Sequence, residues 1–527
     1  MLFSCARVGA PNGGTRDSLA PKFLGSNIDT TRLNVSRTVK ELRLDFDEYV
    51  MLKDFNKNFN VSPPIKKIKK VIPSNLANKY VLIQWEDTLQ ANTTYNFNFG
   101  NAIVDNNESN PLPYFNFAFS TGDKIDDLFV SGTVKDAMTL IKENQTAKDN
   151  KMVVGLYKAG ENLDYKQKPD YITKVDEENY FELNFLPKGE FVIIAFDDEN
   201  QNSVYDAGKE KVSFLKEKIT LDSTSVRGLK LKLYPSKKVV KYKESKAING
   251  GLLMTFEGNP ETVEVKSLSE ELKDFKVTHA KRSDSVNIWF DAEKSNLGGT
   301  VSKQVKLSYF TPTVSNTISV SYKAVKDEFK LSNEAGNLIA PENNFVINTS
   351  LPIENLNTSS WKLESDSIAQ DFTAKISEKN PFKILVNSSF KPTKKYVLTI
   401  PKETVSSYYS SNDKSFQFQF EIDKPENYGS FTAVIKNKPT AKFWVELTNE
   451  KGEILYSQFT NASEVSFKNL KPATYIARIR VDNNGNGFWD EADFAQNIAA
   501  EDVYIFEKEI NVRPLWEIKE DWELTNN

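Results

Sequence analysis

The amino-acid sequence predicts an all-β protein built from tandem β-sandwich domains. Aromatic residues are abundant, with 35 Phe and 20 Tyr, and their flat side chains favour the pleated, half-buried surface of a strand. Short segments alternate apolar and polar residues with period two, and turns rich in Asn, Asp, Gly and Pro separate them. Long helical periodicity is nearly absent. The 527 residues are too many for one hydrophobic core, so we expect several domains.

Residues 1–20 predict an anchor and a tether. Cys5 is the single cysteine of the chain and follows Leu2-Phe3-Ser4, an order typical of the residues before a lipidated cysteine. The residues after it are small, polar and rich in Gly and Pro, as a flexible spacer requires. The charged and long apolar regions of a complete signal are missing, so we expect that the start codon is assigned too late or that the sequence is truncated. No stretch has the roughly 18 consecutive apolar residues of a membrane-spanning helix.

The strand pattern begins at residue 21 and restarts four times. In the first segment Leu42, Leu44 and Phe46 alternate with polar residues. Strands of this length and spacing are typical of antiparallel sandwiches. The predicted domains span residues 21–122, 126–235, 238–323, 327–424 and 427–515, the third being assigned by its strand pattern alone. Residues 516–527 are predicted to form a C-terminal tail.

The second and fifth segments form an internal repeat. A constant shift of 284 residues places Leu186 on Leu470, and the same shift places Asp198 on Asp482. In both copies a turn leads into a strand that ends in an acidic, Asn-rich loop. We therefore expect the same supersecondary unit to be used twice.

The Asn-rich loop of the fifth segment has the spacing of a calcium loop. Oxygen ligands would fall at positions 1, 3, 5, 7, 9 and 12 of twelve, with Gly487 at the sharp turn of position 6. These ligands are Asp482, Asn484, Asn486, Phe488 through its carbonyl, Asp490 and Asp493. The alternative is a long turn in which the Asn and Asp side chains accept hydrogen bonds from their own backbone.

The copy in the second segment fits calcium less well. Its candidate ligands are Asp198, Asn200, Asn202 and Asp206. Position 6 is Ser203 rather than glycine, position 12 is Lys209, and Glu210 comes one place late. We treat it as the weaker of the two candidate sites.

Composition and motifs argue against several functions. One Cys and one His allow neither an internal disulfide nor a zinc site of Cys/His type. His279 is expected to be a half-exposed strand residue. The hydrolase, nucleotide-binding and metalloprotease motifs are missing, so we expect no enzymatic activity and identify no small-molecule substrate. The net charge of −4 does not indicate nucleic-acid binding.

The first segment contains the motifs "LDFDEYV", "DTLQANTTYNFNFGNAIVDNNESNP" and "FSTGD". Through these motifs it resembles the bacterial Ig-like domain of surface-layer proteins and of Bacteroidota envelope lipoproteins. Segments 126–235 and 427–515 resemble transthyretin-like or carboxypeptidase-regulatory sandwiches. In that phylum, export to the cell surface is associated with acidic residues just after the lipidated cysteine. Here the corresponding residues, "ARVGAPNGG", are neutral to basic, a departure that bears on the outward-facing orientation and not on the anchor.

The resemblance and the residues together predict a lipid-anchored outer-membrane protein. We favour the cell surface over the periplasmic face as its location. We expect a non-enzymatic scaffolding or binding subunit beside an integral outer-membrane barrel protein. The resemblance implies one sharper role, as an accessory of the barrel-assembly machinery. The alternatives are a surface adhesin or carbohydrate-binding protein, which exposed tryptophans clustered on one face would favour, and an envelope hydrolase with regulatory β domains.

Overall fold

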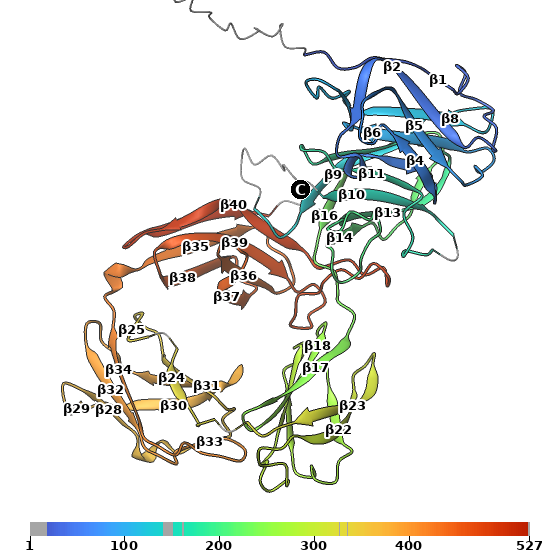
Figure 1. Ribbon diagram of the computed structural model, residues 1–527. Coiled ribbons are helices and arrows are strands. Elements are labelled where there is room, and N and C mark those ends of the chain that lie inside the picture. The colour runs from blue at the N-terminus through green and yellow to red at the C-terminus, as the bar shows by residue number, and fades with distance from the viewer. Residues whose placement is uncertain (1–17, 141–150, 161–162, 326, 335, 525–527) are drawn as a thin grey trace, which may run out of the picture. The chain divides into compact units, whose positions relative to one another are not determined.

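The computed structural model describes residues 18–140, 151–160, 163–325, 327–334 and 336–524. Nearly every regular element in these ranges is a β-strand (Figure 1). The helical elements described are the single turn α1 (Phe55–Asn58) and the 3-10 turns η1 (Thr358–Ser360) and η2 (Pro425–Asn427). The prediction of an all-β protein made of tandem sandwiches is confirmed. Within the described ranges, no helix is long and apolar enough to cross a bilayer.

The chain folds into two compact units. The first contains the residues up to Ser236 together with the short segment Asp490–Ala500. The second contains Lys237–Trp489 and the chain from Glu501 onward. A segment from the C-terminal part of the sequence therefore belongs to the first unit. The domain boundaries predicted from the sequence stay predictions.

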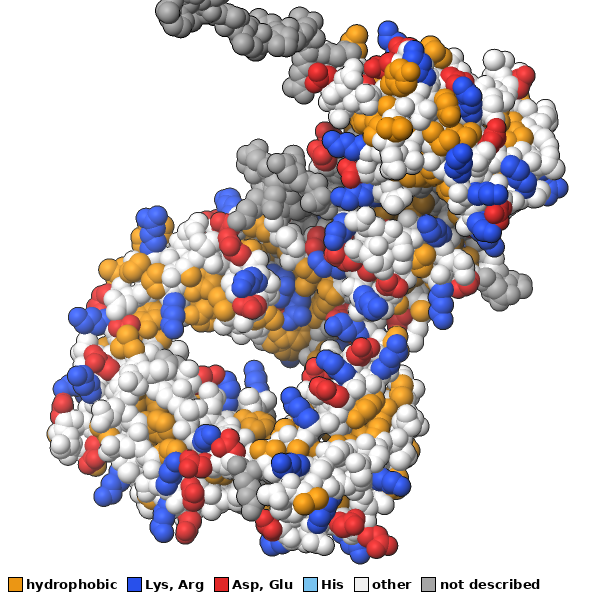
Figure 2. Space-filling model, in the orientation of Figure 1, with side chains coloured by type: hydrophobic (Ala, Val, Ile, Leu, Met, Phe, Trp, Pro, Cys, Tyr) orange, Lys and Arg blue, Asp and Glu red, His pale blue; other side chains and the backbone are white. Residues whose placement is uncertain are grey.

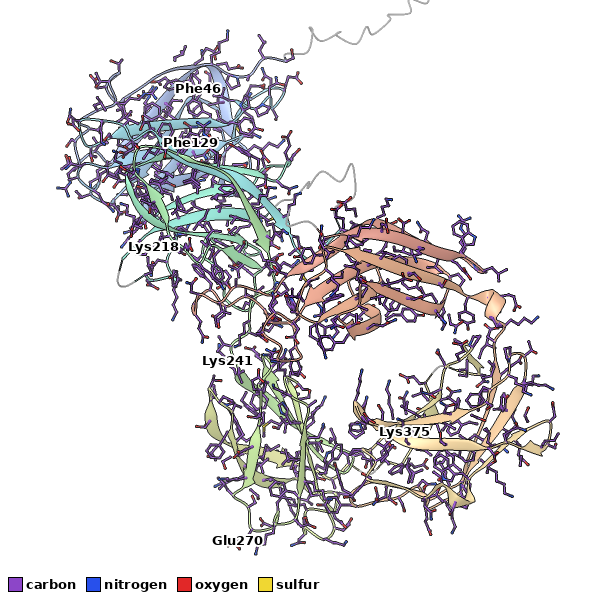
Figure 3. All side chains as sticks on the ribbon, turned by 180° about the vertical axis from the view of Figure 1, so that it is seen from behind. Phe46, Phe129, Lys218, Lys241, Glu270 and Lys375 are labelled. Carbon is purple, nitrogen blue, oxygen red and sulfur yellow. The ribbon has the colours of Figure 1, made fainter. Side chains whose placement is uncertain are left out.

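The first unit begins with a sandwich of two sheets. One sheet has the order β1-β2-β5-β4, with β7 also paired to β2, and the other has the order β3-β6-β8. The strands are β1 (Phe23–Ser26), β2 (Glu41–Leu52), β3 (Asn60–Ser62), β4 (Ile68–Ile72), β5 (Asn78–Trp85), β6 (Thr94–Gly100), β7 (Ile103–Asp105) and β8 (Phe115–Ser120). Leu42, Leu44 and Phe46 of β2 are buried in the core, as their alternation predicted. Phe46 is labelled in Figure 3.

The second sandwich of the first unit has the sheet orders β11-β10-β13-β14 and β12-β9-β16, with β15 also paired to β13. Its strands are β9 (Leu128–Asp136), β10 (Met152–Lys158), β11 (Tyr171–Lys174), β12 (Tyr180–Leu186), β13 (Gly189–Asp197), β14 (Val212–Phe214), β15 (Ile219–Leu221) and β16 (Val226–Leu233). Strand β16 pairs parallel to β9. The carbonyl of Leu229 comes so close to Gly132 that a Cβ there would lie 2.2 Å from it.

A second apolar cluster covers the outer side of the β10–β13–β14 sheet. Phe494, from the segment Asp490–Ala500, packs there against Tyr165, Phe214 and Tyr205, with ring centroids 4.4, 5.1 and 5.9 Å away. The backbone N–H of Ala492 donates to the carbonyl of Pro235 at 3.1 Å. These contacts explain why the segment belongs to the first unit.

The second unit begins with two further sandwiches. The third sandwich has the sheet orders β17-β18-β21-β20 and β19-β22-β23. Its strands are β17 (Lys241–Ile248), β18 (Gly251–Glu257), β19 (Glu264–Ser267), β20 (Lys276–His279), β21 (Ser285–Trp289), β22 (Lys303–Phe310) and β23 (Ser315–Tyr322). Inward residues such as Leu252, Ile288 and Leu307 close its core.

The fourth sandwich has the sheet orders β24-β26-β31-β30 and β25-β34-β32-β28-β29, plus the small pair β27-β33. Its strands are β24 (Leu331–Asn333), β25 (Leu338–Ile339), β26 (Phe345–Thr349), β27 (Asn355–Leu356), β28 (Lys362–Ser365), β29 (Ile368–Ala369), β30 (Phe372–Ser377), β31 (Asn380–Ser388), β32 (Lys395–Ile400), β33 (Val405–Ser406) and β34 (Phe416–Ile422). Phe345 and Phe420 stack between the sheets at 4.1 Å.

The last sandwich repeats the topology of the second. Its sheets have the orders β37-β36-β39-β40 and β38-β35-β41, and β41 pairs parallel to β35 just as β16 pairs to β9. The strands are β35 (Gly429–Lys436), β36 (Phe443–Thr448), β37 (Ile454–Thr460), β38 (Glu464–Leu470), β39 (Ala473–Val481), β40 (Val503–Val512) and β41 (Glu517–Glu523). The predicted internal repeat is confirmed by this shared topology.

The predicted tail from residue 516 onward is wrong for Glu517–Glu523. This segment is strand β41, and its paired residues in β35 lie 87 positions earlier in the chain. Five of its seven residues are charged, which conceals the alternation that places Trp522 in the core at 4% exposure. An edge strand tolerates this composition because its outer face and outer edge remain in water.

Candidate functional site

The loop after β13 is closed by the carboxylate of its first residue. Asp198 is 4% exposed, and its two carboxylate oxygens accept the backbone N–H groups of Asn202 and Ser203, both at 3.0 Å. The side-chain oxygen of Asn202 accepts the N–H of Val204 at 2.6 Å. Asp206 accepts the amide N–H of Asn200 at 2.6 Å. The four candidate ligands of this copy therefore lie in one hydrogen-bonded turn.

Glu210 completes this loop, although its spacing in the sequence did not place it among the ligands. The side chain is buried, and it accepts the backbone N–H of Glu199 at 3.1 Å and that of Asp206 at 2.9 Å. Burial raises the pKa of the Glu210 carboxyl to about 7, and the nearby charges of Asp198 and Asp206 act in the same direction.

The loop after β39 repeats the backbone hydrogen bonds to Asp198 and Asn202 at the positions 284 residues later. Asp482, also buried, accepts the N–H groups of Asn486 and Gly487, both at 3.0 Å. The side-chain oxygen of Asn486 accepts the N–H of Phe488 at 2.8 Å. A buried glutamate again reaches the loop, because Glu501 accepts the N–H of Asn484 at 3.1 Å. Neither Glu210 nor Glu501 falls at the register position that a linear calcium motif prescribes.

The remaining two candidate ligands of the C-terminal loop belong to a different unit from the first four. Asp490 and Asp493 belong to the segment that is part of the first unit, whereas Asp482 through Phe488 belong to the second. Asp493 is used in a turn of its own, where its side chain accepts the N–H of Gln496 at 3.2 Å and its backbone exchanges hydrogen bonds with Ile498. Each unit therefore contains only some of the six predicted calcium ligands.

Among the described residues, no group of three or more His, Cys, Asp or Glu side chains gathers as a metal site. Calcium also accepts amide and carbonyl oxygens, which the two loops supply from Asn200, Asn202, Asn484 and Asn486. The turn hydrogen bonds of the alternative interpretation are present in both loops. Calcium binding stays a prediction.

Asp105 is a structural carboxylate in a motif that pointed to the Ig-like domain. It is 2% exposed and accepts the backbone N–H groups of the four residues from Asn107 to Asn110, at 2.6 to 3.1 Å. Burial by itself would raise the pKa of the Asp105 carboxyl, but the four N–H groups outweigh it and lower the pKa. The segment "DNNESN" is therefore a carboxylate-centred turn.

Three other features are candidates for a functional site: a surface hollow, His279 and Cys5. A shallow hollow of about 440 Å³ is lined by Thr358, Ser359, Trp361, Gln370, Asp371, Phe372, Thr373 and Ala374, which include one carboxylate. His279 is a partly buried residue at the end of β20, as predicted, and its Nε2 lies 3.0 Å from the carbonyl oxygen of Ser283. Cys5, the predicted lipidation site, lies outside the described residues.

Sequence reasoning missed the most unusual side-chain arrangement of the second unit. In β36 the residues Phe443, Val445 and Leu447 point into the core, so Trp444 and Glu446 lie on the opposite face of the sheet. Glu446 is fully buried there, even though it faces away from the core. A pattern of alternation predicts a solvated carboxylate at such a position.

Two arginines of β39 bury this carboxylate. Arg478 donates through Nε at 2.8 Å, and Arg480 through Nε at 3.1 Å to both oxygens of Glu446. The guanidinium of Arg480 lies 5.9 Å from the ring of Trp444 and 5.8 Å from that of Trp489. Trp444 also stacks on Phe459 of β37, with centroids 4.4 Å apart.

Trp444, Phe459, Arg480 and Trp489 together form what we call the aromatic–arginine face. Figure 2 shows hydrophobic and basic side chains gathered over the strands that Figure 1 labels β36, β37 and β39. Of the other tryptophans, Trp85, Trp289, Trp361 and Trp522 are buried in sandwich cores.

Comparison with known proteins identifies the first domain. Residues 17–121 match the bacterial Ig-like domain family, so the chain contains such a domain where the sequence motifs predicted it. No curated protein matches the chain.

Three solved structures illustrate the distant similarity of the chain to known proteins. The surface-layer protein SbsC, domains 1–6, is 12% identical over 94% of this chain and 67% of its own, with a TM-score of 0.16. SGBP-B of the Bacteroides ovatus mixed-linkage glucan utilization locus, in complex with a mixed-linkage heptasaccharide, is 10% identical over 74% and 94%, with a TM-score of 0.20. BcpA, the major pilin subunit of Bacillus cereus, is 11% identical over 76% and 99%, with a TM-score of 0.14. TM-scores this low carry no argument about function.

Proposed function

We propose that this chain is a non-enzymatic protein of the cell envelope, anchored by lipid at Cys5 in the outer membrane and exposed at the cell surface. It acts as a scaffolding or binding subunit beside an integral outer-membrane barrel protein. In the sharpest form of the proposal, it is an accessory of the barrel-assembly machinery. The observation that carries the binding role is the aromatic–arginine face of the last sandwich.

The composition of this face suits protein recognition. Trp, Tyr and Arg dominate the residues whose truncation most weakens protein–protein binding, because each combines a large apolar area with a directed polar group. Here two Trp rings flank one guanidinium, and a Phe ring extends the apolar surface. The fully buried carboxylate of Glu446 accepts a hydrogen bond from this guanidinium and holds it in place. The face is therefore ordered before any partner arrives, which reduces the entropy lost on binding.

A second candidate function, carbohydrate binding, draws on the same face. Trp444 and Phe459 stack at an interplanar angle of 26° and form a partly exposed apolar platform. The C–H groups on one side of a pyranose ring can pack on such a platform, and Arg480 can donate hydrogen bonds to hydroxyl groups. The envelope-hydrolase alternative draws no support from the hollow beside β30, whose lining offers a single carboxylate, Asp371.

We also propose that the two Asp/Asn loops bind calcium in a structural role. Asp198 and Glu210 are carboxylates buried near each other, and the raised pKa of Glu210 reflects the cost of keeping it charged. A divalent cation would reverse this electrostatic cost. The proposed ion would stiffen the loop and take no part in any reaction.

The test of the binding role is affinity purification from detergent-solubilised outer membranes. The wild type should co-purify with an integral barrel protein, and Trp444→Ala should reduce its recovery severalfold. Trp516→Ala is the control, because Trp516 is an exposed tryptophan that lies outside the aromatic–arginine face, whereas Trp444 is partly buried within it. Equal recovery with all three proteins would refute the role of this face. If wild type but not Trp444→Ala is retained by a glycan array, the carbohydrate alternative is favoured.

A further inference from the structure

Strand β37 is an unprotected edge. It is the terminal strand of the sheet β37-β36-β39-β40, and within the described part of the chain β36 is the only strand paired to it. Edge strands expose unpaired backbone N–H and C=O groups, so soluble proteins usually place charged residues or proline on them. The seven residues of β37, "ILYSQFT", contain neither.

The other long edges described in the structure carry charged residues, with one exception. Strand β17 carries three lysines and a glutamate, and β41 carries five charged residues. Of the described edge strands with seven or more residues, one besides β37 has no charge, namely β23. Its exposed residues are Ser, Thr and Asn, and its Val320 and Tyr322 are buried.

The exposed side chains of β37 are instead large and apolar. Ile454, Leu455 and Phe459 are 46%, 49% and 44% exposed. The register with β36 shifts by one residue at this point, with Leu447 opposite Tyr456 and Thr448 opposite Ile454, so that Leu455 has no cross-strand neighbour of its own. An apolar, uncharged edge with free backbone groups is suited to pairing with another strand.

We propose that β37 pairs with β37 of a second copy of this chain, in antiparallel orientation around a twofold axis. Full overlap of the seven residues places the axis at the central residue, Ser457. Leu455 of one copy then lies opposite Phe459 of the other, and Phe459 opposite Leu455, so two of the three exposed apolar positions gain an apolar neighbour, and Ile454 lies opposite Thr460. The two four-stranded sheets become one continuous sheet of eight strands.

The second copy fits this edge for a physical reason. In the self-paired register no charge lies opposite another charge, because β37 carries none. Odd-numbered residues face odd-numbered residues, so Leu455 and Phe459 of both copies lie on the same side of the joined sheet. A twofold axis makes every favourable pair occur twice.

Sedimentation of the full chain tests the proposal, with Cys5→Ser included so that no disulfide can link two copies. The chain with the wild-type β37 sequence should show a monomer–dimer equilibrium. Leu455→Lys and Phe459→Glu should each raise the dissociation constant at least about tenfold, because each places a charge against an apolar side chain at two symmetric positions. Ile368→Lys is the matched control: Ile368 is also an exposed apolar residue, on the edge strand β29, and its substitution should leave the dissociation constant unchanged.

The double variant Leu455→Lys/Phe459→Glu tests the register. In the proposed dimer the introduced ammonium of one copy would face the introduced carboxylate of the other, so the dissociation constant should return to within about threefold of wild type. Leu455→Lys/Phe459→Lys should remain monomeric. Circular dichroism checks that every variant is folded. A wild-type chain that is monomeric at about 100 µM, or a double variant no tighter than its parents, overturns the proposal.

Discussion

The buried carboxylate of Glu446 offers the sharpest test of how the last sandwich is stabilised. Its side chain is 1% exposed and is shared by Arg478, which is 8% exposed, and Arg480, which is 22% exposed. Replacing it with Gln leaves two guanidinium groups side by side with no compensating charge. We expect Glu446→Gln to destabilise this sandwich far more than any exposed charge change.

The magnitude follows from the geometry. Two unit charges about 4 Å apart at an effective dielectric constant of about 20 attract by about 4 kcal/mol. Removing one partner of a buried ion pair costs about 3–5 kcal/mol, because the remaining charge is both desolvated and unpaired. At about 3 kcal/mol the population of locally unfolded molecules rises roughly 150-fold.

Amide hydrogen exchange followed by mass spectrometry measures this locally in the full chain. Peptides from β36 and β39 should lose protection by about two orders of magnitude, and peptides from β26 and β31 in the fourth sandwich should not change. Asp222→Asn is the control, since its ion pair with Lys188 is exposed and should contribute less than about 1 kcal/mol. Unchanged protection in β36 would refute the reasoning.

Four further predictions concern other parts of the chain. Cys5→Ala should move the protein from the outer-membrane fraction to the soluble fraction, because the acyl anchor is lost. Calcium at about a hundredfold excess over Kd should stabilise the full chain by about 2.7 kcal/mol per site, and Asp482→Ala should remove the contribution of its loop to the melting shift. Asp105→Asn should cost about 1–3 kcal/mol at pH 7, since the four backbone N–H groups lose a charged acceptor. The purified chain should show no turnover of common glycans, peptides or esters.

Each of these has a distinct contrary result. Sedimentation of Cys5→Ala with washed membranes would argue against the anchor, and identical melting in calcium and in EDTA would show that the loops are turns without metal. The Asp105 carboxyl has a lowered pKa in the folded state, so its stabilisation is complete above the unfolded-state pKa and is lost as the pH falls through the folded pKa. The difference between Asp105→Asn and wild type should therefore shrink below about pH 4, and a constant difference would contradict it. Turnover lost on mutating one carboxylate would overturn the non-enzymatic proposal.

Local patterns in the sequence determined the fold class and several sites of strand formation. Leu42, Leu44 and Phe46 alternate because one face of β2 packs on a core, and this period of two is a property of neighbouring residues alone. The repeat between the second and last sandwiches could also be recognised from the sequence, because both copies need the same turn after β13 and β39. The first residue of each loop, Asp198 or Asp482, accepts backbone N–H groups of that loop, and its predicted role as a calcium ligand stays a prediction.

The tertiary structure alone decided the features that depend on distant partners. Strand β41 is mostly charged, and its partner residues in β35 lie 87 positions away in the sequence. Glu210 and Glu501 reach their loops through the fold rather than at a fixed spacing. Glu446 sits where alternation predicts a solvated side chain, and two arginines on the adjacent strand bury it. Sequence periodicity reports which face a residue occupies, but burial and pairing on that face depend on which strands the chain brings beside it.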